Sequence, residues 1–461
     1  MTTLIRNGAV ILPDKTCKAD ILLQDGRVAA VASDLVIENA ASVDAGGCLV
    51  LPGGIDVHTH ITLDLDAALG TDLYYRGTLP ALAGGTTSII DHMAFMPKGR
   101  SPDEQAALYL GLALGQSVVD YAFHGVIQPG YEFEDLKRLA ARGVTSVKAY
   151  MTYAGRLDDA TLLGLLKDCR KLGLLLAVHA EDHDCVESRK QAFKAAGRGE
   201  PIWHAASRPA ECEAKAVARL LDLARQAGDA PIYIVHLSTA AGLEAVIRAK
   251  DAGQKNILVE TCLQYLLLTG DCYNDPEAGL RYIMAPPLRE QADTDALWQG
   301  LRDGHIQTVA TDHCSFTLAD KARGRGDFTL CPGGAPGLEE RMALLYSEGV
   351  AKGRISLERF VELTAFTPAT LFGLTSKGNL LPGADADLII LDPAEDWILH
   401  AADLHGPSDY SLYEGWRVQG RIKAVFARGH AFFHDNQLEM TPGLGRYLKR
   451  EISASSNQAR S

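Results

Sequence analysis

Apolar residues along the chain change their spacing near Leu51. Before it, short apolar segments are separated by Asn-Gly, Asp-Gly and Gly-Gly turns, a pattern that predicts small antiparallel strands. After it, near-continuous Val, Ile and Leu segments alternate with long helix-forming spacers, at 55–58, 87–92, 121–127, 146–150, 174–179, 232–236, 257–262 and 308–313. Buried strands alternating with helices predict a parallel sheet covered on both faces, and eight of them predict a (β/α)8 TIM-like barrel of the α/β class.

Strand and turn patterns return after the predicted barrel, at 378–392 and 421–436. We expect these segments to join the N-terminal strands in one small β-sandwich domain built from both chain ends. The predicted division is 1–50 for the N-terminal part of the sandwich, 51–375 for the catalytic barrel, 376–440 for the C-terminal part of the sandwich and 441–461 for a polar arm or tail.

The composition excludes several classes of protein and of binding partner. The 461 residues are 47% hydrophobic and 22% charged, which excludes disordered and collagen-like chains. The net charge of −13 argues against nucleic acid or an anionic membrane as the main partner. No signal-type N-terminus or long uninterrupted apolar stretch occurs, so we expect a cytoplasmic protein. Nine scattered cysteines without a CxxC pair predict a reducing compartment and no disulfide framework.

Histidines stand at the carboxyl ends of several predicted strands, where barrel active sites are built. His58 and His60 are two positions apart, so they point to the same side of their strand and can bind one ion. His179 and His236 each end an apolar strand, where an unpaired imidazole is costly to bury. Taken alone, a hydrogen-bonded core histidine is the better interpretation of either one. Their expected meeting at one barrel mouth favours metal ligation.

Two further residues extend this set. Asp312 ends the eighth apolar strand, where it can coordinate metal or transfer a proton, and an N-cap for the next helix is the alternative. Lys148 lies on the fourth strand, and its ammonium would be repelled by divalent cations. Conversion by CO₂ to a carbamate would make it an anion able to bridge two metals. By itself, a lysine extending to solvent at a strand end is the simpler interpretation.

Ten motifs occur in a fixed order over nearly the whole chain: PGGIDVHTH (52–60), AGGTTSIIDHM (83–93), SVKAYMTY (146–153), VHAED (178–182), SRPAECEA (207–214), YIVHLS (233–238), VETCLQYLLL (259–268), APPLR (285–289), ATDHCSF (310–316) and GADADLIILD (383–392). Together they resemble the cyclic amidohydrolases, in the hydantoinase and dihydropyrimidinase branch of the amidohydrolase superfamily, and look closest to the phenylhydantoinases.

The resemblance implies two Zn²⁺ ions per subunit, bridged by N6-carboxylysine at Lys148 and by a hydroxide. It implies these further ligands: His58, His60 and Asp312 for one ion, His179 and His236 for the other. It also implies a homotetramer that acts on a small cyclic ureide or amide.

Substrate contacts follow from the same resemblance. Tyr153 occupies the place of the tyrosine that polarises the scissile carbonyl, and packing through its ring alone is the alternative. Ala285 stands where family members usually carry Ser, and Gly333 stands where they carry Asn. In relatives these positions meet the ureide mainly through backbone groups, so the departures leave ring specificity open. Apolar residues after the first two strands suit a bulky exocyclic substituent or ordinary packing: Leu63, Leu65 and Phe95.

These features predict hydrolytic opening of a 5-substituted hydantoin or a dihydropyrimidine to an N-carbamoyl amino acid. Asp312 would accept the proton of the attacking hydroxide and return it to the ring nitrogen, while Tyr153 would stabilise the oxyanion. Allantoinase, dihydropyrimidinase proper and dihydroorotase are alternatives within this chemistry. A non-catalytic assembly protein that has kept the fold is the alternative from another class.

Overall fold

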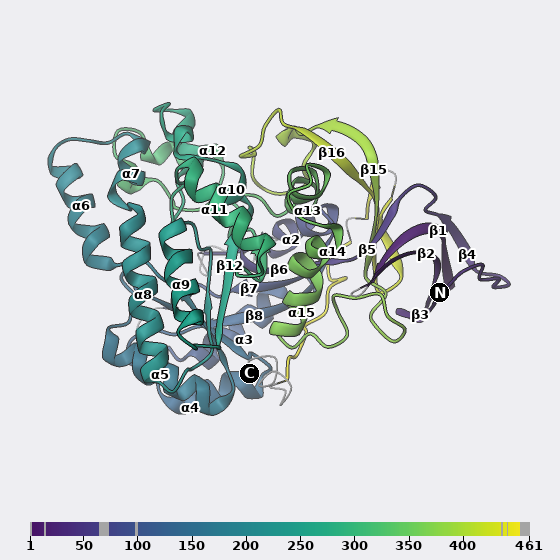
Figure 1. The fold of residues 1–461 in the computed structure, drawn as a ribbon, viewed down its shortest axis with the longest axis horizontal. Coiled ribbons are helices and arrows are strands. Elements are labelled where there is room, and N and C mark those ends of the chain that lie inside the picture. Colours follow the sequence, from purple (N-terminus) through teal and green to yellow (C-terminus); the bar gives the residue numbers. More distant parts are fainter. Residues whose placement is uncertain are drawn as a thin grey trace.

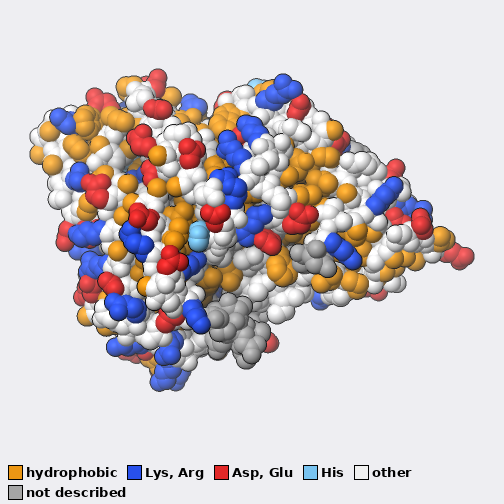
Figure 2. Space-filling view, in the orientation of Figure 1, with side chains coloured by type: hydrophobic (Ala, Val, Ile, Leu, Met, Phe, Trp, Pro, Cys, Tyr) orange, Lys and Arg blue, Asp and Glu red, His pale blue; other side chains and the backbone are white. Residues whose placement is uncertain are grey.

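The computed structural model describes residues 2–12, 15–63, 73–96, 100–434, 437–439 and 441–451. These residues form two sheets, and helices surround one of them (Figure 1). Acidic and basic side chains are interspersed over the face seen in Figure 2. Within the described ranges, no helix is both long enough and apolar enough to cross a membrane.

The strands of the barrel are parallel, and a divided last strand closes the ring. In order they are β6 (Gly54–His60), β7 (Thr86–His92), β8 (Asp120–Val126), β9 (Ser146–Tyr150), β10 (Leu175–His179), β11 (Ile232–Ile234), β12 (Ile257–Cys262), β13 (Thr308–Ala310) and β14 (His313–Cys314). β13 pairs with β12, whereas β14 pairs with β6. The predicted TIM-like barrel is confirmed, with its eighth strand split around Thr311 and Asp312.

Helices cover the outside of the barrel sheet (Figure 1). They are α2 (Leu73–Ala83), α3 (Pro102–Ala113), α4 (Phe133–Ala141), α5 (Asp159–Leu172), α6 (His183–Ala195), α7 (Pro201–Ser207), α8 (Ala210–Gln226), α9 (Ala240–Asp251), α10 (Leu263–Leu267), α11 (Gln291–Arg302), α12 (Leu318–Lys321), α13 (Arg341–Leu345), α14 (Leu357–Val361) and α15 (Thr367–Leu371). Local chemistry sets their ends. Before α5, the Asp158 carboxylate accepts a hydrogen bond from the Thr161 amide, and Gly173 ends the helix at φ 70°.

The second sheet contains strands from both ends of the chain. They are β1 (Thr2–Leu12), β2 (Lys15–Gln24), β3 (Arg27–Ala32), β4 (Ala41–Asp44), β5 (Leu49–Pro52), β15 (Leu388–Ile398), β16 (Arg417–Ala427), β17 (His430–His434) and β18 (Gln437–Leu438). β5 pairs with β1 on one side and with β15 on the other, so the purple and yellow-green strands of Figure 1 are continuous. The predicted joining of the two chain ends is confirmed.

A buried charge cluster connects the two sheets. Lys377 Nζ lies 2.6 Å from Asp120 Oδ2, at the start of β8. The same ammonium lies 3.0 Å from Asp385 Oδ2 and 2.6 Å from Asp387 Oδ2, just before β15. Arg428 also contacts Asp120. Three carboxylates and two cations therefore hold the sandwich against the barrel.

The described part of the predicted C-terminal arm, residues 441–451, lies against the barrel. The Leu448 amide donates a hydrogen bond to the Tyr121 carbonyl at 2.7 Å. Arg450 is only 2% exposed and donates to Ser146 Oγ at 2.9 Å. This stretch of the arm thus places an arginine in buried contact with the barrel strands β8 and β9.

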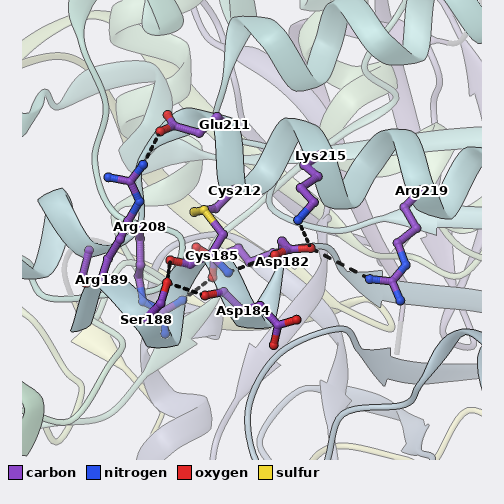
Figure 3. The surroundings of a disulfide bond; sticks show 12 residues. Asp182, Asp184, Cys185, Ser188, Arg189, Arg208, Glu211, Cys212, Lys215 and Arg219 are labelled. Carbon is purple, nitrogen blue, oxygen red and sulfur yellow. Dashed lines mark hydrogen bonds and ion pairs between the residues drawn. A yellow bond between two sulfur atoms is a disulfide. The ribbon is translucent and has the colours of Figure 1, made fainter. Parts of the chain in front are cut away.

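A single disulfide joins Cys185 to Cys212, whose Cα atoms are 5.7 Å apart (Figure 3). The other seven cysteines are free. One bridge is not the disulfide framework that the sequence argued against. Nothing in the 27-residue spacing of these two cysteines predicts that they pair. The two cysteines meet because each lies in the first turn of its helix, Cys185 in α6 and Cys212 in α8, and these two helix starts lie side by side (Figure 3).

Candidate active site

The predicted ligand residues meet at the carboxyl ends of the barrel strands. His58 and His60 lie at the end of β6, Lys148 lies on β9 and His179 ends β10. His236 follows β11 by two residues. Because all these strands are parallel, their carboxyl ends share one rim, as the sequence predicted.

Asp312 occupies the break between β13 and β14, and its carboxylate faces two imidazoles. Its Oδ1 lies 3.1 Å from His58 Nε2 and 3.1 Å from His60 Nε2. Burial opposes ionisation of this carboxyl group, but the two imidazoles hold the pKa of Asp312 well below its usual range. Asp312 is therefore an anion at neutral pH, placed between two imidazole nitrogens.

The donor set fits a metal ion. Ligand atoms of His58, His236 and Asp312 all lie within 4.8 Å of one another. His60 Nδ1 and His236 Nδ1 are buried without a hydrogen-bond partner, which is unfavourable unless something else occupies them. Burial lowers the pKa of both His60 and His236, so their rings are neutral, as metal ligation requires. Imidazole and carboxylate groups are the ligands that Zn²⁺ takes in catalytic sites.

Glu260, on β12, holds this ligand set in place from behind. Its Oε1 lies 2.6 Å from His58 Nδ1 and accepts a hydrogen bond from the His236 amide at 2.9 Å. Tyr233 donates to its other oxygen at 2.9 Å. Burial would lower the pKa of His58, but the Glu260 and Asp312 carboxylates outweigh it and raise that pKa to about 9. The two carboxylates therefore supply negative charge around His58 that a bound cation would balance.

Lys148 and Tyr153 complete the rim. Lys148 is 1% exposed, and burial lowers its pKa to about 8, so a substantial fraction of its amine is neutral near physiological pH. The Tyr153 ring lies 5.0 Å from that of His179, centroid to centroid, and burial raises the pKa of its hydroxyl. Tyr153 (φ 71°), His236 (φ 40°) and Asp312 (φ 53°) all adopt left-handed backbone conformations. Such strain in residues other than glycine is typical of functional positions.

These residues line a cavity of about 250 Å³. Its other walls include five residues for which the sequence predicted substrate contact: Leu63, Phe95, Tyr153, Ala285 and Gly333. Leu65 lies outside the described residues. Leu63 and Phe95 are 43% and 39% exposed, unusual values for apolar side chains in a cavity wall, as expected of a surface that meets a ligand. The catalytic and binding roles of all these residues stay predictions.

Sequence reasoning missed Glu260, Glu181 and Arg208. Glu260 is 0% exposed within an otherwise apolar strand, and an acid in such a strand is the signal that could have found it. Glu181 Oε2 lies 2.8 Å from His179 Nε2, and Arg208 contacts the same carboxylate. Their motifs, VHAED and SRPAECEA, carry the family resemblance, but only the fold brings them together.

The amidohydrolase family model matches residues 49–432 of this chain. The chain is also 44% identical, over 98% of both chains, to D-phenylhydantoinase of Escherichia coli O1:K1 / APEC. This chain belongs to the amidohydrolase family. The prediction of a hydrolase of the hydantoinase and dihydropyrimidinase type is confirmed.

Solved structures agree with this assignment. The crystal structure of dihydropyrimidinase from Brevibacillus agri matches with a TM-score of 0.93 and 38% identity, over 98% of this chain and 100% of that one. L-hydantoinase (dihydropyrimidinase) from Arthrobacter aurescens matches with a TM-score of 0.89 and 32% identity, over 98% and 100%. The barrel and the sandwich of this chain are thus those of known hydantoinase structures.

Proposed function

We propose that this chain hydrolyses the ring amide of 5-substituted hydantoins or dihydropyrimidines to N-carbamoyl amino acids. The observation that carries the proposal is the convergence of six ligand-type residues beside Tyr153 in one cavity, in a chain 44% identical to a D-phenylhydantoinase over its whole length. The same six residues argue against a non-catalytic assembly protein, which has no need of them. Dihydropyrimidinase proper and allantoinase are the alternatives within this chemistry.

Two zinc ions would be held by His58, His60 and Asp312 on one side and by His179 and His236 on the other, with carboxylated Lys148 between them. When bound, they would lower the pKa of water enough to supply hydroxide at neutral pH. The lowered pKa of Lys148 supports carbamylation, because only the neutral amine reacts with CO₂. The unpartnered nitrogens of His60 and His236 support ligation.

The chain's own side chains would orient the substrate and move the proton. The Tyr153 hydroxyl donates a hydrogen bond to the carbonyl oxygen as negative charge develops on it. The Asp312 carboxylate accepts the proton of the attacking water and returns it to the departing ring nitrogen, a role worth roughly 10²–10⁴-fold in rate. Backbone groups at Ala285 and Gly333 hold the ureide, while Leu63 and Phe95 pack against the exocyclic group.

The test compares phenylhydantoin, dihydrouracil and allantoin as substrates of the purified protein, together with its zinc content. We expect phenylhydantoin to be the best substrate. His58→Ala should lose both metal and turnover, and unimpaired turnover in this variant would contradict the ligand assignment. Light scattering tests the homotetramer that the resemblance implies.

A further inference from the structure

A buried ion pair lies directly behind the rim of the site. Arg208, which follows α7, contacts the carboxylate of Glu181, which follows β10. The Glu181 side chain is fully buried and that of Arg208 is 10% exposed. Glu181 also lies 2.8 Å from His179, one of the proposed metal ligands. The ion pair is therefore fixed to the site at its Glu181 end.

The other face of Arg208 meets Tyr153. The guanidinium carbon lies 5.4 Å from the centre of the Tyr153 ring, within the range of a cation–π contact. One planar cation thus contacts both the phenol and the carboxylate. Arginine suits this position because its planar guanidinium can stack on an aromatic ring while its N–H groups pair with a carboxylate. A lysine ammonium is a compact charge on a flexible side chain and does not combine both contacts.

Tyr153 needs such support because its own backbone does not favour its position. Its φ of 71° lies in the left-handed region, where residues other than glycine cost about 1–3 kcal/mol and persist only when their surroundings fix them. The loop that carries Tyr153 makes a backbone turn in which the Arg156 amide donates to the Tyr153 carbonyl at 3.3 Å. That bond orients the backbone and leaves the phenol to side-chain contacts.

Arg208 itself is firmly held. Arg289 donates a hydrogen bond to the Arg208 carbonyl, and its Nε donates to Ser238 Oγ at 2.9 Å. The disulfide partners Cys185 and Cys212 come four residues after Glu181 and Arg208, respectively. Figure 3 shows both cysteines beside Arg208 at the start of their helices. The two segments that carry the ion pair are therefore also joined covalently.

We propose that Arg208 is a positioning residue that fixes the Tyr153 hydroxyl against the reacting carbonyl, with Glu181 as its anchor. This inference rests on the proposed function, in which Tyr153 stabilises the oxyanion. Arg208 does not itself touch substrate in this scheme. Replacing it should lower kcat through Tyr153 and leave KM and metal binding nearly unchanged.

A double-mutant cycle tests the proposal on the zinc-loaded enzyme with phenylhydantoin. Loss of an oxyanion donor costs about 10²–10³-fold, so Tyr153→Phe should lower kcat about 100-fold. Arg208→Lys should lower kcat about tenfold, since a misplaced catalytic group loses part of its effect. The double variant should be no more than about threefold slower than Tyr153→Phe, because the second change removes support from a hydroxyl that is already gone.

Arg189→Lys is the matched control. Arg189 on α6 pairs with Glu211 on α8 at 2.8 Å, so this ion pair joins the two helices that the disulfide also joins (Figure 3). Unlike that of Arg208, the Arg189 side chain is 43% exposed. This variant should keep wild-type kcat. Multiplicative losses in the double variant, or metal loss in Arg208→Lys, would overturn the proposal. If Arg208→Lys does not fold by circular dichroism, Arg208→Gln takes its place in the cycle.

Crystal structures of the Arg208 and Arg189 variants separate this inference from the proposed function. The Tyr153 ring should be displaced in the Arg208 variant and unchanged in Arg189→Lys, whatever the substrate proves to be. An unmoved Tyr153 would refute the positioning role. Failure of the wild-type protein to open any cyclic ureide would refute the proposed function instead.

Discussion

Two buried clusters in this protein each bring three ligand-type atoms within 4.8 Å of one another, yet they differ in what balances their charge. The barrel cluster consists of His58, His236 and Asp312, and it borders the cavity at the barrel mouth. Its neighbours leave imidazole nitrogens without partners. In the proposed function, a bound metal ion supplies the positive charge at this cluster.

The interdomain cluster consists of Asp120, Asp385 and Asp387, and it already contains a cation. The Lys377 ammonium lies within 3.0 Å of an oxygen of each carboxylate, and the charge of these partners raises the Lys377 pKa despite its burial. Buried charges are tolerated when paired and hydrogen-bonded. The comparison teaches that proximity of ligand-type atoms alone does not distinguish a metal site from a cluster of ion pairs. Buried donor nitrogens without a partner, beside a cavity, are what favour a metal.

The largest expected effect comes from breaking the barrel cluster. His236→Ala should lower the bound metal per subunit and decrease kcat about a thousandfold, because loss of metal removes several kcal/mol of transition-state stabilisation. Metal analysis and phenylhydantoin turnover check this. His305→Ala, at a partly exposed histidine after α11, is the control. Full metal content in His236→Ala would remove this residue from the ligand set.

Breaking the interdomain cluster should affect stability instead. Lys377→Met leaves three buried carboxylates without their shared cation, which should lower the free energy of unfolding by about 3–5 kcal/mol. Urea denaturation measures this, and kcat per folded molecule should not change. Lys423→Met, which removes a partly exposed pair with Glu395 in the same sheet, should cost less than about 1 kcal/mol. Rescue of Lys377→Met by millimolar Ca²⁺ would show that the emptied cluster takes an ion.

Glu340 extends the comparison, because this carboxyl group is 3% exposed and forms no ion pair with any residue that the structure describes. Burial and the neighbouring charge of Glu339 raise its pKa to about 7. A carboxyl group with a raised pKa stabilises the fold fully below its unfolded pKa, near 4.5, and this contribution is lost as pH rises through about 7. Wild type should therefore lose about 2 kcal/mol between pH 5 and 8 through this group.

Glu340→Gln should flatten that part of the pH profile of unfolding, since an amide does not ionise. The Ser411 hydroxyl, which donates to Glu340 Oε1 at 2.9 Å, keeps an acceptor in the variant. Glu244→Gln, at an exposed position on α9, is the control and should leave the slope unchanged. An unchanged slope in Glu340→Gln would mean that the buried group is ionised at all these pH values.

The smallest expected effect concerns the support behind the barrel cluster. Glu260→Gln keeps one acceptor oxygen but removes the negative charge facing His58, so metal affinity should fall about tenfold. Titration against a competing chelator measures this. Unchanged affinity would show that Glu260 only holds the backbone of His236.

The sequence predicted the barrel and the candidate ligands better than the residues that hold those ligands in place. Parallel strands buried on both faces leave near-continuous apolar segments, so the barrel and the candidate ligands at its strand ends could be located. The sequence did not predict the supporting residues Glu260, Glu181 and Arg208, because their contacts are with residues that are distant along the chain. Arg208, for example, lies 27 residues from Glu181, and no local periodicity links them.

The disulfide and the buried position of Arg450 in the C-terminal segment were not predicted, for the same reason. Cys185 and Cys212 are neighbours only because α6 and α8 start side by side. Arg450 lies in a polar segment typical of an exposed tail, yet its guanidinium is buried against Ser146 and Phe123. Burial of a single arginine leaves no pattern in a sequence.

The split eighth strand has a consequence for how the enzyme forms. β13 pairs with β12 and β14 pairs with β6, and Asp312 is one of the two residues between β13 and β14. A folding intermediate whose last strand is undocked has an open sheet and also lacks the carboxylate that faces His58 and His60. In the proposed mechanism, we therefore expect closure of the ring to deliver the carboxylate on which hydrolysis depends, so that an open barrel is inactive.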